Sequence, residues 1–120
     1  MKKIILIVDD EEILIQTISK LLERCGYQTA RASTGQDALS MAESEKIDLI
    51  ICDMRMPGMN GVETVTEIRK LKPEMPVVFV TGYADQKIEA LAQTLKPLAY
   101  IHKPFDIQEL LGTLKKHFES

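Results

Sequence analysis

The sequence predicts an α/β fold in which five parallel strands form one sheet with helices on both faces. Two observations support this prediction. Short apolar runs without alternation, typical of strands buried on both faces, alternate strictly with segments whose apolar residues recur at helical spacing. Polar residues follow the ends of several of these runs, where open α/β sheets place their binding and reaction chemistry.

The first strand is predicted at residues 4–8, an apolar run that ends at Asp9 and Asp10. The helix after it should end at Gly26, because glycine readily adopts the left-handed conformation that closes many helices. Its inward residues are expected to be Leu14, Ile18, Leu21, Leu22 and Cys25. A less apolar strand follows at residues 27–32, which suggests a place near an edge of the sheet.

The third strand is predicted at residues 49–52, and it ends on Asp53. The helix before it can be capped by Thr34, and its buried side should include Ala38, Leu39 and Ala42. Turn residues follow the strand, namely Pro57, Gly58, Asn60 and Gly61. This stretch places a carboxylate at the C-terminal tip of a buried strand.

The helix after this turn can be capped by Asn60 and must end before Pro73. Its inward residues are expected to be Val62, Val65, Ile68 and Leu71. A fourth buried strand is predicted at residues 77–80, and Thr81 and Gly82 follow it.

The last third of the chain should contain a helix that begins near Asp85 and a fifth strand at residues 98–101. The inward residues of that helix are expected to be Ile88, Leu91, Ala92 and Leu95. Asp106 and Glu109 make a plausible capping pair for the final helix. The inner face of the final helix should consist of Ile107, Leu110, Leu111, Leu114 and Phe118.

The alternation and the right-handed rule for parallel crossovers leave few topologies. The strand order 2-1-3-4-5 places strands 1 and 3 side by side at the point where the order reverses, and so brings Asp9, Asp10 and Asp53 together. The chain length of 120 residues fits a single domain over residues 1–120.

Composition narrows the classes of function. The net charge is −3 and no basic stripe occurs, which argues against direct binding to nucleic acid. The first apolar run stops at Asp9, so it is too short for an export signal or a membrane span. Cys25 and Cys52 lie on predicted apolar faces and are expected to be reduced core residues, as in a cytoplasmic protein.

The strand ends gather Asp9, Asp10, Asp53, Thr81 and Lys103 at one edge of the sheet. Three close carboxylates repel one another unless a cation lies among them, and oxygen ligands with room for water suit Mg²⁺. A metal would keep Asp53 ionised, so that it can act as the nucleophile toward a phosphoryl group. Lys103 can supply a second cation, and the Thr81 hydroxyl a hydrogen bond to a phosphoryl oxygen.

Each of these residues also has an ordinary structural explanation. A lone acid at a strand end is usually a helix cap or a solvated loop residue, and the run from Asp9 to Glu12 suits a helix N-terminus. Lys103 alone is more often a surface lysine than a ligand. The gathering of all five residues on one sheet edge favours the functional interpretation.

The sequence resembles the receiver domains of bacterial two-component response regulators, including the single-domain chemotaxis regulators, which have a flavodoxin-like fold. The matching motifs occur in family order and cover essentially the whole chain. They are Val8-Asp9-Asp10, Asp53-Met54-Arg55-Met56-Pro57 with Gly61, Thr81-Gly82 and Lys103-Pro104-Phe105.

The resemblance implies that Asp53 accepts a phosphoryl group from a phosphohistidine of a sensor histidine kinase or phosphotransfer protein. Asp10, Asp53 and the backbone carbonyl of Arg55 would bind Mg²⁺ directly, while Asp9 would act largely through water. Lys103 would pair with the phosphoryl group, and the bond from Lys103 to Pro104 is expected to be cis. Such a chain is a phosphoacceptor switch that catalyses its own phosphorylation and dephosphorylation, and not an enzyme acting on other substrates.

Thr81 and Tyr100 resemble the family's switch pair, and the ordinary alternative for Tyr100 is a half-buried aromatic at a strand end. On phosphorylation the Thr81 hydroxyl would move toward the new oxygens, and the Tyr100 ring would turn into the vacated space. This would reshape the face formed by the helix near Asp85, the fifth strand and the final helix. A downstream effector would bind this face, and dimerisation through it stays open.

Two large side chains should border the mouth of the pocket. Arg55 lies two residues beyond Asp53, and Tyr83 lies two residues beyond Thr81. Either could shield the phosphoryl group from water, or be merely exposed.

Three other functions fit the sequence less well. Phosphatases of the haloacid dehalogenase type carry the nucleophile on the first strand with a second acid two residues later, where this chain has Arg55 after Asp53. A flavin phosphate would be repelled by the acidic turn after the first strand, and the phosphate-binding loop of nucleotide switches is absent. The kinase, the stimulus, the output and the choice between a stand-alone regulator and part of a longer one stay undecided.

Overall fold

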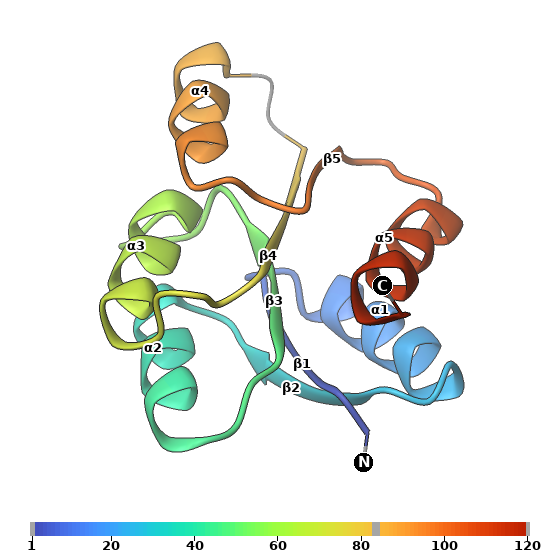
Figure 1. Cartoon of the computed structure of the whole chain (residues 1–120). Helices are drawn as coiled ribbons and strands as arrows, with labels where there is room; N and C mark the ends of the chain where they lie inside the picture. The colour runs from blue at the N-terminus through green and yellow to red at the C-terminus, as the bar shows by residue number, and fades with distance from the viewer. Residues whose placement is uncertain (1, 83–84, 120) are drawn as a thin grey trace.

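The computed structural model describes residues 2–82 and 85–119. Its five strands are parallel and form one sheet in the order β2-β1-β3-β4-β5 (Figure 1). The strands are β1 (Ile4–Val8), β2 (Gln28–Ala32), β3 (Leu49–Asp53), β4 (Val77–Thr81) and β5 (Ala99–His102). The predicted fold class and strand order are therefore confirmed.

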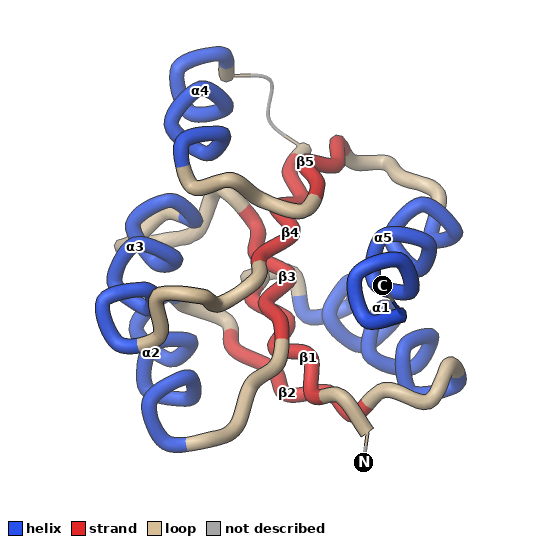
Figure 2. Tube along the Cα trace, viewed as in Figure 1, coloured by secondary structure: helices blue, strands red, loops and turns tan. Residues whose placement is uncertain are grey.

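The helices cover the sheet in two layers. Helices α2, α3 and α4 lie on one face, while α1 and α5 lie together on the other (Figure 2). Their bounds are α1 (Glu12–Arg24), α2 (Gly35–Ser44), α3 (Gly61–Leu71), α4 (Gln86–Thr94) and α5 (Ile107–Glu119). None of these helices has the length and apolar composition that crossing a membrane would require.

Alternate residues of the central strands enter two separate cores. In β3, Leu49 and Ile51 belong to the core under α1 and α5, whereas Ile50 and Cys52 belong to the core under α2, α3 and α4. Since side chains of a strand point to opposite faces in turn, both faces must be apolar when both are covered. This explains the unbroken apolar runs in the sequence.

The predicted caps hold the helix starts. The Thr34 side chain accepts a hydrogen bond from the Asp37 amide, and Asn60 forms a reciprocal capping box with Glu63. Gly26 has φ of 95°, which is the left-handed conformation expected after the end of α1.

Three predicted core residues are exposed instead. Cys25 follows the last turn of α1, whose buried residues are Ile15, Ile18, Ser19 and Leu22. Leu71 is the final residue of α3 and is 51% exposed. Leu91 of α4 is 55% exposed because Ala92, its neighbour, occupies the centre of the inward stripe. Cys52 is buried as predicted.

Gly61 allows the start of α3 to lie directly against the end of β3. A Cβ atom at this position would stand 2.5 Å from the carbonyl oxygen of Asp53. The Gly61 amide donates to the Met54 carbonyl at 3.0 Å. The loop after Asp53 is thereby closed tightly on the strand that carries this residue.

Arg69 of α3 connects three segments on the face of the sheet opposite to the one that α1 covers. Its Nε and Nη2 atoms donate to the Met75 carbonyl at 3.1 and 2.9 Å, and Nη1 donates to the Leu95 carbonyl at the end of α4. Burial lowers the pKa of this guanidinium below its usual value. Nothing in the helical pattern predicted this bridge.

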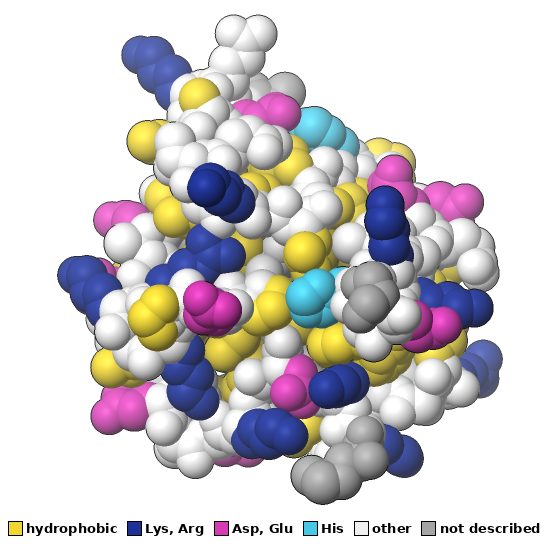
Figure 3. Space-filling view, in the orientation of Figure 1, with side chains coloured by type: hydrophobic (Ala, Val, Ile, Leu, Met, Phe, Trp, Pro, Cys, Tyr) yellow, Lys and Arg dark blue, Asp and Glu magenta, His cyan; other side chains and the backbone are white. Residues whose placement is uncertain are grey.

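The surface carries mixed charges. On the face shown in Figure 3, basic and acidic side chains are interspersed over several elements, and no continuous basic stripe occurs among the described residues there. The net charge of the chain is −3.

Candidate functional site

The C-terminal ends of the strands bring the predicted site residues together. Asp53 ends β3, Thr81 ends β4, and Asp9 and Lys103 directly follow β1 and β5. A cavity of about 230 Å³ opens between them. It is lined by Asp10, Glu11, Asp53, Arg55, Thr81, Gly82 and Lys103.

Burial divides these residues into two groups. Asp9 is 4% exposed, Asp53 6% and Thr81 0%, so the polar groups at the base of the pocket are nearly out of solvent. Asp10 and Arg55 are exposed at its mouth. The sequence predicted Arg55 at the rim, whereas Tyr83 lies outside the described residues.

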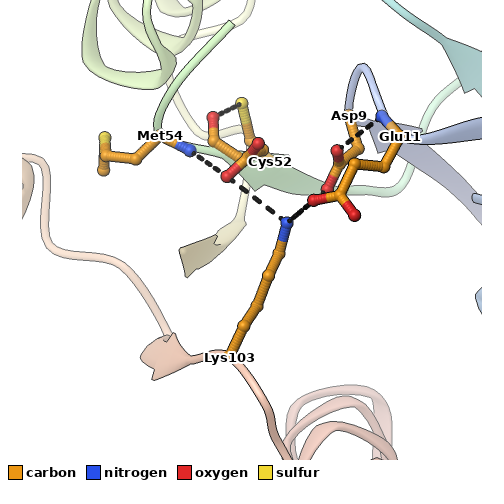
Figure 4. Close-up of polar contacts among 6 residues, drawn as sticks. Asp9, Glu11, Cys52, Met54 and Lys103 are labelled. Carbon is orange, nitrogen blue, oxygen red and sulfur yellow. Dashed lines mark hydrogen bonds and ion pairs between the residues drawn. The ribbon is translucent and has the colours of Figure 1, made fainter. Parts of the chain in front are cut away.

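Lys103 reaches across the pocket to three carboxylates (Figure 4). Its Nζ atom lies 3.0 Å from Asp9 Oδ2, 3.1 Å from Glu11 Oε1 and 3.8 Å from Asp53 Oδ1. The peptide bond that follows Lys103 is cis, as predicted. The contact with Glu11 was not predicted, because an acid at the start of a helix has an ordinary explanation in the helix dipole.

The carboxylate of Asp53 is influenced by a backbone hydrogen bond, by burial and by nearby charged side chains. Its Oδ1 atom accepts a hydrogen bond from the Met54 amide at 2.8 Å. Burial, followed by the charge of Asp9, raises the pKa of Asp53 to about 6, against the lowering effects of Lys103 and the backbone amides. The pKa of Lys103 is also raised, since its hydrogen bond to Asp9 and the charge of Asp53 outweigh its own burial.

The three acids fit a divalent cation. Asp9, Asp10 and Asp53 each offer a carboxylate oxygen, and these atoms lie within 4.8 Å of one another. Carboxylate oxygens beside open space are suitable ligands for a hard ion that keeps several waters. Burial and then the charge of Asp9 raise the pKa of Asp53 despite the nearby Lys103, so the metal-free site disfavours the ionised form of this carboxylate. The residues present therefore suit Mg²⁺, while the role of the Arg55 carbonyl stays a prediction.

Tyr100 and Thr81 belong to neighbouring strands on the same side of the sheet as α4. The ring of Tyr100 is half-buried, with its centroid 6.2 Å from that of Phe79 and 5.3 Å from that of His102. In the β4–β5 register, Tyr100 pairs with Phe79 and Thr81 pairs with His102. Thr81 and Tyr100 thus lie on adjacent strands, and their role as a switch pair stays a prediction.

A family model described as "Response regulator receiver domain" matches residues 5–115. The transcriptional regulatory protein ZraR of Escherichia coli K12 is 38% identical over 114 residues, which cover 93% of this chain and 25% of that protein. The sporulation initiation phosphotransferase F of Bacillus subtilis is 32% identical, and the match covers 98% of this chain and 94% of that protein. The chain thus spans about a quarter of one relative and nearly all of the other.

Solved structures agree with this family match. A CheY-like response regulator receiver domain protein from Methanospirillum hungatei has a TM-score of 0.94 at 33% identity, covering 99% of this chain and 95% of that one. A response regulator from Burkholderia pseudomallei, described with a phosphorylated aspartic acid and a calcium ion, has a TM-score of 0.85 at 28% identity. That match covers 94% of this chain and 66% of the other.

Proposed function

The chain belongs to the response regulator receiver domain family of two-component systems, and on this premise we propose that Asp53 is its phosphoacceptor. One observation supports the choice of Asp53 above all. It is a nearly buried carboxylate beside two further acids and within 3.8 Å of the Lys103 ammonium. Such a site can concentrate cations around a nucleophile, which is what phosphoryl transfer needs most.

The contacts of Asp53 indicate which of its atoms reacts. Oδ1 accepts the hydrogen bond from the Met54 amide and lies 3.8 Å from Lys103 Nζ, and we assign the attack on phosphorus to the other oxygen, Oδ2. A bond from Oδ2 to phosphorus forms while the bond from phosphorus to the donor breaks, and the leaving group departs with that electron pair. Lys103 then pairs with the phosphoryl oxygens, and the Thr81 hydroxyl donates a hydrogen bond to one of them.

Asp9, Asp10, Asp53 and the backbone carbonyl of Arg55 would hold Mg²⁺ at this site, with Asp9 acting largely through water. When bound, the ion neutralises the acids and the negative charge of the transferring group. Asp53 is consumed and regenerated in its own reaction, so the chain acts as a phosphoacceptor switch and not as an enzyme with a separate substrate.

The proposed partners follow from membership of the family. The donor would be a phosphohistidine of a sensor kinase or a phosphotransfer protein. The output would pass from Thr81 to Tyr100 and then to the face formed by α4, β5 and α5, where an effector binds. Dimerisation through that face and a cytoplasmic location stay predictions.

Incubation with acetyl phosphate tests the proposed function directly. In the presence of Mg²⁺ we expect the mass to increase by one phosphoryl group, carried by the peptide that contains Asp53 and lost in acid or base as an acyl phosphate is. Chelation of Mg²⁺ should suppress the reaction. A stable adduct on a serine or threonine, or an adduct in another peptide, would contradict the proposal.

Mg²⁺ should stabilise the protein through Asp10. At 100 times its dissociation constant, a ligand that binds only the folded state adds about 2.7 kcal/mol to the free energy of unfolding. Asp10→Asn should lose most of this gain in thermal melts with and without Mg²⁺. Asp37→Asn is a suitable control, because Asp37 is an exposed acid in the first turn of α2. Equal stabilisation of both variants would place the metal elsewhere.

Arg55→Ala is expected to shorten the lifetime of the phosphoryl group. Hydrolysis requires water in line with the bond to Asp53, and the exposed Arg55 lines the mouth of the cavity through which water must enter. Tyr83→Ala should act in the same direction, although Tyr83 lies outside the described residues. The decay of phosphorylated protein at fixed Mg²⁺, after removal of the donor, measures this. Unchanged or slower decay in both variants would mean that neither side chain shields the bond.

A further inference from the structure

Glu11 makes a contact for which neither the fold nor the proposed metal site gives a reason. Its Oε1 atom lies 3.1 Å from Lys103 Nζ, almost as close as Asp9 Oδ2 at 3.0 Å. Asp53, the proposed phosphoacceptor, is farther from the same ammonium at 3.8 Å. Figure 4 shows the Lys103 side chain extended toward Asp9 and Glu11.

The backbone of Glu11 explains why its side chain takes this course. Glu11 occupies the N-cap position of α1, but its side chain forms no capping hydrogen bond. Its amide donates to Asp9 Oδ1 at 2.9 Å, and its carbonyl accepts the first helical hydrogen bond from Ile15. With the backbone fixed at both ends, the carboxylate is directed over the pocket and not back to the helix start.

We propose that Glu11 is a positioning residue for Lys103, which it shares with Asp9 before phosphorylation and must release when a phosphoryl group arrives. The inference rests on the proposed function of Asp53. The side chain of Glu11 is 63% exposed, whereas that of Lys103 is 16% exposed. Returning a carboxylate to water therefore costs the least free energy for Glu11. We expect Lys103 to separate from Glu11, and not from Asp9, when the phosphoryl group arrives.

This competition slows the transfer step. During transfer, phosphorus forms a bond to Asp53 Oδ2 and loses its bond to the donor oxygen, and acetate leaves acetyl phosphate with the electron pair. Negative charge on the phosphoryl oxygens is best compensated when Lys103 points at them. A molecule in which Lys103 is paired with Glu11 lacks this contact. Glu11 therefore lowers the fraction of molecules in which Lys103 points at the phosphoryl oxygens.

Glu11→Gln tests this inference against a matched control. Glutamine keeps the length of the side chain and removes the charge, and Glu12→Gln removes a neighbouring exposed charge from the first turn of α1. Partly exposed ion pairs change equilibria by about two- to fivefold. At saturating Mg²⁺ we expect Glu11→Gln to accelerate acetyl phosphate labelling of Asp53 by about this factor, and Glu12→Gln to leave the rate unchanged. Equal acceleration in both variants, or none in Glu11→Gln, would overturn the inference.

Mg²⁺ binding without any phosphodonor gives a second readout. Without Glu11, the Lys103 ammonium turns to Asp9 and Asp53 and competes with the ion for their oxygens. Glu11→Gln should therefore raise the Mg²⁺ dissociation constant more than Glu12→Gln does, and this excess should disappear in a Lys103→Gln background. An excess that persists without Lys103 would contradict the role of the pair.

The two proposals can fail separately. A wild-type protein that gains no phosphoryl group at Asp53 would refute the proposed function, while the Mg²⁺ measurement would still test the pairing of Glu11 with Lys103. A wild-type protein that is labelled at Asp53, with no response to Glu11→Gln, would refute only the positioning role.

Discussion

Asp53→Asn is expected to abolish phosphorylation by acetyl phosphate. The amide keeps the shape of the side chain and an oxygen for the Met54 amide, but it lacks a charged nucleophilic oxygen. Asp9 cannot replace it, because its Oδ1 accepts from the Glu11 amide and its Oδ2 is paired with Lys103. The mass spectrum of the variant after incubation should therefore show no adduct.

Asp48→Asn provides the control at the opposite end of the same strand. Asp48 directly precedes β3 and accepts a hydrogen bond from the Ile4 amide at 2.8 Å. It is also an acid beside the sheet, but it lies far from the pocket. Its variant should be labelled like the wild type. Labelling that survives in Asp53→Asn would show that another residue is the acceptor.

The same Asp53→Asn change should stabilise the metal-free protein at neutral pH. The pKa of Asp53 rises from its ordinary value of 3.8 to about 6 on folding, so the folded state binds the proton more tightly than the unfolded state. Stability from this group is thus greatest below pH 4 and is lost as the pH rises through about 6. A shift of about two units corresponds to about 3 kcal/mol at pH 7.

Asparagine does not titrate, so the stability difference between Asp53→Asn and the wild type should depend on pH. In urea unfolding with a chelator present, Asp53→Asn should exceed the wild type by about 3 kcal/mol at pH 7. The difference should shrink as the pH falls through 6 and vanish near pH 4. Added Mg²⁺ should reduce the advantage at pH 7, since the ion neutralises the wild-type carboxylates. A difference that does not change with pH would assign the stabilisation to packing and not to charge.

Most of the fold could be predicted because the three central strands, β1, β3 and β4, are apolar on both faces. The runs that became β1, β3 and β4 have no alternation, and covered parallel strands have this pattern. The errors concern helix residues that fit helical spacing yet are exposed. These are Leu71 at the end of α3 and Leu91 within α4. Periodicity identifies the stripe of a helix that faces the core, but the extent of the surface beneath it decides how much of that stripe is covered.

The candidate site could be predicted as far as the strand ends determine it. Asp9, Asp53, Thr81 and Lys103 meet because each lies at or directly after the end of a parallel strand. Glu11 could not be singled out within the acidic run from Asp9 to Glu12. Which of these acids faces Lys103 depends on the residue at which α1 begins and on the hydrogen bond from the Glu11 amide to Asp9.

The bridge made by Arg69 has a mechanical consequence for α4. The guanidinium holds the Leu95 carbonyl at the end of this helix, and Ala92, near the same end, is its only buried residue. The first turn is capped by its own Asp85, and Figure 1 shows α4 standing out from the rest of the molecule. The hydrogen bond from Arg69 and the buried Ala92 therefore both attach α4 at its C-terminal end. In the proposed switch, a displacement that begins at Thr81 would move the first turns of α4. These turns contact the rest of the molecule through the packing of Ile88 and the 3.8 Å approach of Glu89 to His102, and they also carry the exposed Leu91.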